Sequence, residues 1–124
     1  MSRINDEVGS VLRGLAMDLG HDIVGAMLIY RNGFVVSSIS RNGVDSKSLS
    51  AILTTLKGSI DKMLGKAGLG GSDLIIIRSG EFVIIVTPVN QDVLLANVLH
   101  DTANLGLALL AVENAREKIS KVIQ

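Results

Sequence analysis

The sequence contains no cysteine, so disulfide bonds, thiol catalysis and zinc–thiolate sites are all excluded. It is also poor in aromatic residues. Only three occur, namely Tyr30, Phe34 and Phe82, whereas proteins that bind single-stranded nucleic acid stack the bases on aromatic side chains. We therefore expect no thiol chemistry and no nucleic-acid partner.

Charge is scarce as well. Charged residues make up 19% of the 124 residues, against about 25% in a typical soluble domain. Twelve basic residues balance twelve acidic ones, and a net charge of zero gives no general attraction to nucleic acid or to an acidic membrane. A low net charge also does little to keep copies of the chain apart, which is compatible with an oligomer.

Long apolar runs are absent too. The longest uncharged runs are 82–91 and 102–112, whereas a membrane-spanning helix needs about 20 residues. The first residues include acids where a signal peptide would have an apolar core. A chain of this length forms one domain. We therefore expect a single soluble, cytoplasmic domain over residues 1–124, with no membrane partner.

Isoleucine and valine are plentiful, and residues 74–89 hold the densest apolar run. Both residue types are β-branched and suit a pleated strand better than a helix. Ser79-Gly80 interrupts the run once, which predicts a β-hairpin. Each strand carries consecutive apolar residues, so apolar side chains point to both faces of the hairpin. Both faces must therefore be covered.

Three more strands are predicted around this hairpin. Residues 23–31 and 34–39 flank Asn32-Gly33, which is the strongest short hairpin signal because both residues accept positive φ. A fifth strand is predicted over 93–98. The second strand is short and carries serines, as an exposed sheet edge should.

Apolar residues at helical spacing predict three helices, over 2–19, 46–66 and 103–122. The element order is therefore α-β-β-α-β-β-β-α, an α/β chain of the α+β type arranged as a three-layer α/β/α sandwich. The first and last helices are expected to share one face of the sheet, and the middle helix to cover the other. The stripe of the middle helix expected to pack on the sheet is Leu49, Ile52, Leu53, Leu56, Ile60, Met63 and Leu64.

The back of the middle helix is made of small residues, where a solvent-facing back is usually rich in Lys and Glu. This favours a second helix packed against it, although an exposed face that happens to be small is the alternative. Strand 73–78 also lacks a proline, a bulge or an internal charge before Arg78, the features that normally blunt an edge strand. The predicted dimer interface comprises Ala51, Thr54, Thr55, Gly58, Ser59, Lys62, Asp73, Leu74, Ile75, Ile76, Ile77 and Arg78.

The element order resembles that of the roadblock family (dynein light-chain roadblock type). Asn32-Gly33 in the first hairpin, Val-Gly-Ala at 24–26 and Ala-Asn-Leu-Gly at 103–106 carry the resemblance, which covers nearly the whole chain. It implies a profilin-like, mainly antiparallel sheet of strand order 2-1-5-4-3. It also implies a homodimer, in which the third strand pairs with its mate and the two middle helices stack. In bacteria and archaea the family is associated with Ras-like small GTPases, as activators or scaffolds.

No catalytic, cofactor or metal site is predicted. His21 and His100 each precede an aspartate, but neither pair has the spacing of metal ligands, so both are interpreted as solvated loop histidines. Asp61 and Lys62 are interpreted as surface charges. The roadblock resemblance supplies no catalytic residue to transfer.

Three hypotheses about function follow. The first is a non-enzymatic homodimeric regulator or scaffold that binds a Ras-like small GTPase. The second is a structural adaptor, or light-chain subunit of a larger complex, without effect on nucleotide turnover. The third is a profilin-like sensor of a small ligand, which would require a pocket.

Overall fold

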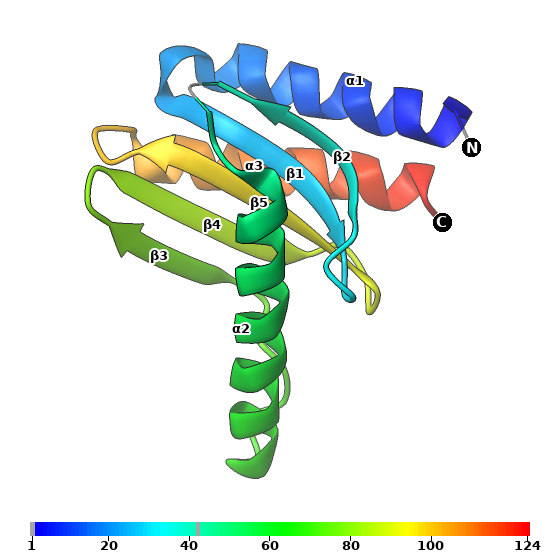
Figure 1. The fold of residues 1–124 in the computed structure, drawn as a ribbon, viewed down its shortest axis with the longest axis vertical. Coiled ribbons are helices and arrows are strands. Elements are labelled where there is room, and N and C mark those ends of the chain that lie inside the picture. Colours follow the sequence, from blue (N-terminus) through cyan, green and yellow to red (C-terminus); the bar gives the residue numbers. More distant parts are fainter. Residues whose placement is uncertain (1, 42) are drawn as a thin grey trace.

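A computed structural model describes residues 2–41 and 43–124 (Figure 1). The helices and strands fall close to the predicted ranges. They are α1 (Ser2–Leu19), the short 3-10 helix η1 (Gly20–Asp22), β1 (Ile23–Tyr30), β2 (Val35–Ser40), α2 (Ser46–Lys66), β3 (Ile75–Ser79), β4 (Phe82–Pro88), β5 (Val93–His100) and α3 (Leu105–Val122).

The strands form a five-stranded sheet of order β2-β1-β5-β4-β3, and every neighbouring pair is antiparallel. The predicted α+β fold and the strand order implied by the roadblock resemblance are thereby confirmed. The central strands β1 and β5 are buried over almost their whole length. Except for Asn97, the buried side chains of these strands are apolar on both faces, so the sheet needs cover on both sides.

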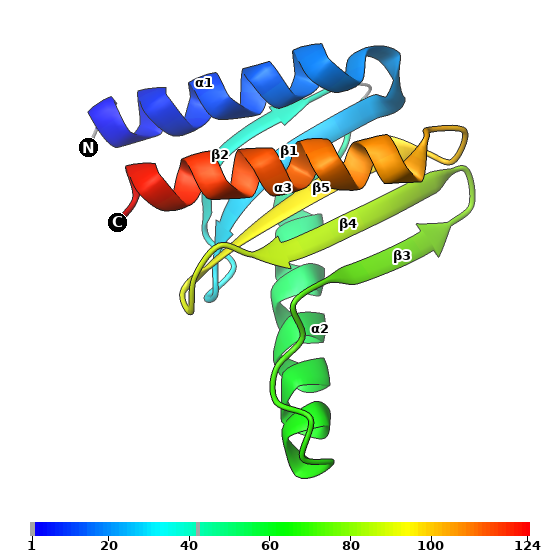
Figure 2. The ribbon, with the colours of Figure 1, turned by 180° about the vertical axis from the view of Figure 1, so that it is seen from behind.

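One face is well covered. Helices α1 and α3 lie side by side across it, as both ribbon views show (Figures 1 and 2). Leu12 and Leu15 from α1, Ile119 from α3, and Ile85 and Leu95 from the sheet meet there, and each is at most 1% exposed. The prediction that the first and last helices share a face is confirmed.

The other face is covered only in part, which corrects the prediction for α2. Of the predicted stripe, Leu53 is buried, whereas Ile52 is 61% exposed and Met63 is 62% exposed. The exposure of Met63, near the end of the helix, follows from the path of the helix. Its first half crosses the sheet, and its second half extends beyond the sheet with the segment 67–74 running back alongside it (Figure 2).

Side chains fix where two of the helices begin. The Asp45 carboxylate accepts a hydrogen bond from the Ser48 amide at the start of α2, and the Asn104 side chain accepts one from the Leu107 amide at the start of α3. These bonds satisfy amides that have no partner within the helix. Because Asn104 is the cap, α3 begins two residues later than the apolar pattern predicted.

In the described part of the chain no helix is both long and apolar enough to cross a bilayer.

The packing of α3 yields a first prediction. Ile119→Ala removes a side chain that is 0% exposed, and should lower the free energy of unfolding by about 2–5 kcal/mol because it leaves a cavity. Leu110→Ala on the same helix removes a side chain that is 61% exposed, and should change that energy by no more than about 0.5 kcal/mol. Urea unfolding followed by circular dichroism measures both, and equal losses would contradict this packing.

Candidate dimer interface

The two edge strands of the sheet differ sharply in character. On β2, the serines at 37, 38 and 40 stand among half-buried apolar residues, and α1 packs against this strand. On β3, Ile75, Ile76 and Ile77 follow one another, and in the described chain no strand lies beyond them. An apolar edge with unpaired backbone groups is a template for pairing with another strand. The edge suited to a second chain is therefore β3.

The side chains of β3 divide between the two faces of the sheet. Ile75 and Ile77 pair with Val86 and Ile84 and belong to the apolar cluster on the α2 side. Ile76 points to the opposite face and is 41% exposed. The Ile76 side chain thus stays partly in contact with water in the single chain.

An open apolar groove lies next to α2, on the face opposite to the Ile76 side chain. Its lining includes Leu49 and Ile52 from α2 and Phe82 and Ile84 from β4, and its volume is about 310 Å³. The sequence did not reveal this groove, because Ile52 was expected to pack on the sheet. Together with β3, the groove makes one side of the molecule apolar and incompletely covered.

The predicted small back of α2 lies at the surface. Ala51, Thr55, Gly58 and Ser59 are exposed, as is Lys62. A Cβ atom added at Gly58 would meet no atom within 4 Å. The helix back therefore has room for a close neighbour. Whether a second α2 occupies that space stays a prediction.

The other predicted interface residues lie at or beside the β3 edge, with one exception. Thr54 is half-buried, and its hydroxyl donates to the carbonyl of Ser50 (2.9 Å). Asp73 and Leu74 precede the strand and are exposed. Arg78 is exposed as well, with its guanidinium 3.9 Å from the Asp101 carboxylate. Thr54 is thus tied into its own helix more than the sequence suggested.

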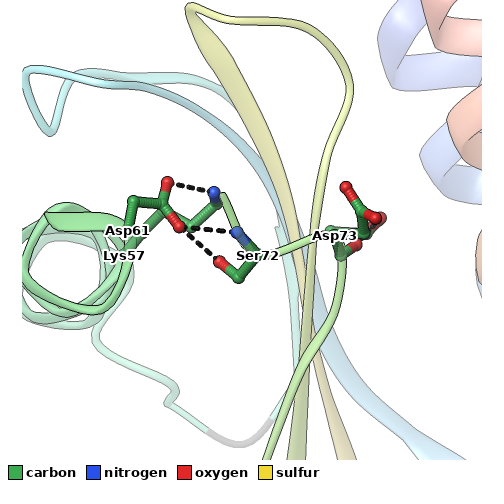
Figure 3. A network of polar contacts seen from close by, with 5 residues as sticks. Lys57, Asp61, Ser72 and Asp73 are labelled. Carbon is green, nitrogen blue, oxygen red and sulfur yellow. Dashed lines mark hydrogen bonds and ion pairs between the residues drawn. The ribbon is translucent and has the colours of Figure 1, made fainter. Parts of the chain in front are cut away.

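A polar network joins α2 to the segment that leads into β3 (Figure 3). One oxygen of the Asp61 carboxylate accepts hydrogen bonds from the amide of Ser72 (2.8 Å) and from its hydroxyl (2.6 Å). The other oxygen accepts from the Nζ of Lys57, whose side chain is only 14% exposed. The interpretation of Asp61 as a surface charge did not include this network, although its side chain is 34% exposed.

The network perturbs the acidity of Asp61. Partial burial works to raise the pKa of this carboxyl, but the hydrogen bonds from Lys57 and Ser72 outweigh it and lower the pKa to about 2. The sequence held only a weak signal for the contact, namely Lys57 four residues before Asp61 on one helix face. The bond to Ser72 spans a glycine-rich segment whose path no local pattern fixes.

A larger cleft lies beside the same part of α2. It has a volume of about 650 Å³ and is lined by α2 residues, by the β4–β5 turn and by Arg31. Its charged groups are opposed in sign, because Lys57 faces Asp61 and Arg31 lies 3.7 Å from Asp92. This mixed lining singles out no one charge of ligand.

The two histidines do not form a site. His21 is exposed, and the ring of His100 lies 5.8 Å from that of Phe82, centre to centre. Across residues 2–41 and 43–124, no three His, Asp or Glu side chains come together as metal ligands would.

The sequence and the structure were compared with those of known proteins. No protein-family model matches the chain. An uncharacterized protein from Methanocaldococcus jannaschii is 24% identical over 106 residues, which covers 85% of this chain and 91% of that protein. MglB from Myxococcus xanthus superposes with a TM-score of 0.88 at 18% identity, covering 95% of this chain and 88% of MglB. A Roadblock/LC7 domain from Streptomyces avermitilis superposes with a TM-score of 0.84 at 13% identity, covering 93% of this chain and 96% of that domain.

The chain has the roadblock fold. The resemblance stated from the sequence is thereby confirmed at the level of structure. Profilin from Schizosaccharomyces pombe also superposes, with a TM-score of 0.63 at 17% identity over 95% of this chain and 97% of profilin. The expectation of a profilin-like sheet is confirmed too.

The interface prediction is tested by two substitutions. Ile76→Lys places a charge on the β3 edge, and Gly58→Glu places one on the open back of α2, where the single chain has room for it. Each should convert a dimer to a monomer, because two-fold symmetry would bring like charges together. Light scattering after size-exclusion chromatography gives the mass.

Matched controls exist on other elements. Ser38→Lys puts the same charge on the β2 edge, and Gly14→Glu puts a glutamate on α1, where an added Cβ also meets no atom within 4 Å. Both should leave the mass unchanged. If Ile76→Lys and Gly58→Glu keep the mass of the unsubstituted protein, this interface is ruled out.

The acidity of Asp61 yields a further prediction. A carboxyl whose pKa falls from 3.8 to about 2 on folding stabilises the fold above pH 3.8, and this contribution is lost as the pH falls toward 2. The stability advantage of the unsubstituted protein over Asp61→Asn should therefore shrink across that window. Urea unfolding of both proteins at several pH values measures the difference, in which the other carboxyls cancel. An advantage that is constant with pH would contradict the pKa.

Proposed function

We propose that the chain functions as a homodimer in which β3 of each copy pairs with β3 of the other and the two α2 helices stack. Three features support this proposal. The β3 edge is apolar and unpaired, a groove beside α2 leaves Ile52 and Phe82 in contact with water, and the back of α2 is small and open at Gly58. Joining two such surfaces would remove this apolar area from water.

We further propose that the dimer is a non-enzymatic regulator or scaffold of a Ras-like small GTPase. The observation that carries this proposal is the roadblock fold, shared over nearly the whole chain with MglB and with Roadblock/LC7 domains. Association with small GTPases is what the roadblock resemblance implies for bacterial and archaeal chains. Self-association has a parallel in a solved MglB with a tetrameric arrangement, which superposes with a TM-score of 0.88 at 19% identity over 96% of this chain and 89% of that one.

The arginines suggest how such a regulator would act. An arginine that reaches into a GTPase site needs a long, uncommitted side chain. Here Arg41 donates to the carbonyl of Gly20 (2.6 Å), Arg116 binds Glu113, and Arg78 lies near Asp101. Because the other arginines are also scattered along the sequence without a motif, we favour a mechanism in which the dimer orders the catalytic groups of the GTPase itself.

The decisive experiment uses the purified dimer and a Ras-like GTPase encoded beside its gene. Calorimetry with the GDP form and with a form carrying a non-hydrolysable GTP analogue measures binding. The rate of GTP hydrolysis with and without the dimer measures activation. We expect binding that depends on the nucleotide, because a regulator must distinguish the two states of its partner.

The outcomes separate the hypotheses. Binding with faster hydrolysis supports an activator, and binding without a rate change supports a scaffold or a structural adaptor. No binding in either nucleotide state would rule out the GTPase partner. A small-ligand sensor is the second candidate, because the cleft of about 650 Å³ is in the size range of small-molecule sites. A small molecule retained by the natively purified protein in mass spectrometry would favour it.

A further inference from the structure

The segment that joins α2 to β3 has little of its own to hold it in place. Residues 67–74 contain three glycines, and Gly68 and Gly70 both adopt a φ of 78°. Its two large apolar side chains are poorly anchored, since Leu69 is 71% exposed and Leu74 is 47% exposed. A glycine-rich segment without buried side chains loses much conformational freedom when it is fixed. Polar contacts must therefore fix its path.

Two such contacts act on consecutive residues and come from opposite sides. On the α2 side, Asp61 accepts both hydrogen bonds of Ser72 and is itself held by Lys57 (Figure 3). On the sheet side, the hydroxyl of Thr87 in β4 donates to the carbonyl of Asp73 (3.2 Å). Residues 72 and 73 are thus bridged between the projecting half of α2 and the sheet.

The bridge lies between the two halves of the proposed dimer interface. Asp73 and Leu74 belong to the proposed pairing edge but precede the hydrogen-bonded strand, which begins at Ile75. The small back of α2 is the other half, and Asp61 lies on that same helix. Pairing of β3 and stacking of α2 can occur in the same dimer only if the position of the β3 edge relative to α2 is fixed.

We propose that Asp61 is a positioning residue that latches the 67–74 segment to α2 and so holds the β3 edge ready for pairing with a second copy. This inference rests on the proposed homodimer and adds a residue outside its contact surface. The latch raises affinity by preorganisation, because a monomer with an ordered edge has less freedom to lose on association.

The effect on affinity has a defined form. If a fraction f of monomers holds the edge in place, the apparent Kd of one partner rises as 1/f. Both copies of the dimer carry the latch, so the dimer Kd rises as 1/f². A variant that lowers f from near one to about one third should therefore raise the Kd about ninefold.

The test compares Asp61→Asn with the unsubstituted protein. Amide hydrogen exchange measured by NMR at a concentration where the chain is monomeric reports the opening of the latch at Ser72 and in β3. Sedimentation velocity over a concentration series gives the dimer Kd. We expect Asp61→Asn to speed amide exchange at Ser72 and in β3. We also expect the dimer Kd to rise in proportion to 1/f², where f is the fraction of monomers with the edge in place.

Two further variants sharpen the comparison. Ser72→Ala removes one of the two Ser72 bonds and leaves the helix intact, so it should change exchange and Kd in the same direction by a smaller factor. Asp92→Asn is the matched control, because Asp92 is a carboxylate of the same cleft that lies 3.7 Å from Arg31 and does not bind the segment. It should change neither quantity.

The possible failures are distinguishable. Unchanged exchange in Asp61→Asn and Ser72→Ala would overturn the latch itself. Faster exchange with an unchanged Kd would overturn its role in pairing. A monomer at every concentration for the unsubstituted protein would overturn the homodimer, and the exchange data would still decide whether Asp61 fixes the segment.

Discussion

The structure depends on one constraint: a sheet that is apolar on both faces has to be kept from water by a chain of only 124 residues. Two helices meet this need on one face, where Leu12, Leu95 and Ile119 are fully buried. A single helix meets it on the other face, and that helix covers only part of the sheet before it extends past it. What the third layer leaves open on its own face is the groove at Ile52 and Phe82, next to the half-buried Ile75 and Ile77, whereas the exposed Ile76 lies on the opposite face.

The path of α2 therefore governs the surface chemistry of the molecule. Had the helix lain flat across the sheet, its stripe would have filled the groove and the chain would have resembled a self-sufficient monomer. Because it projects, its small back stays accessible and the following segment must return along it to reach β3. Asp61, which accepts from Lys57, binds Ser72 of this returning segment. The path of α2 thus leaves an apolar surface exposed, and it also requires hydrogen bonds to hold the segment beside that surface in place.

The fold was predictable from the sequence to within a few residues, because each element depends on local signals. The Asn32-Gly33 turn, the Ile and Val runs and the helical spacing of α1 and α3 are all readable over short windows. The site was less predictable. The periodicity of α2 gave the stripe, but it gave neither the length over which the helix meets the sheet nor the exposure of Ile52, since both depend on the crossing direction. The bond from Ser72 to Asp61 joins residues separated by a glycine-rich segment, and glycine places few limits on the backbone.

The proposed mode of action sets a requirement on the surface of the dimer. If the chain regulates a GTPase by ordering the partner's own catalytic groups, as proposed, it must favour one of the partner's conformations. Such selection requires a rigid surface, because a surface that adjusts to both conformations distinguishes neither. The described chain has a glycine-rich segment at the border of its apolar side. Ordering that segment, through the Asp61 network and then through pairing of β3, would turn two adaptable surfaces into one fixed surface. Dimerisation would then be a condition for regulation, and not merely a way to cover apolar residues.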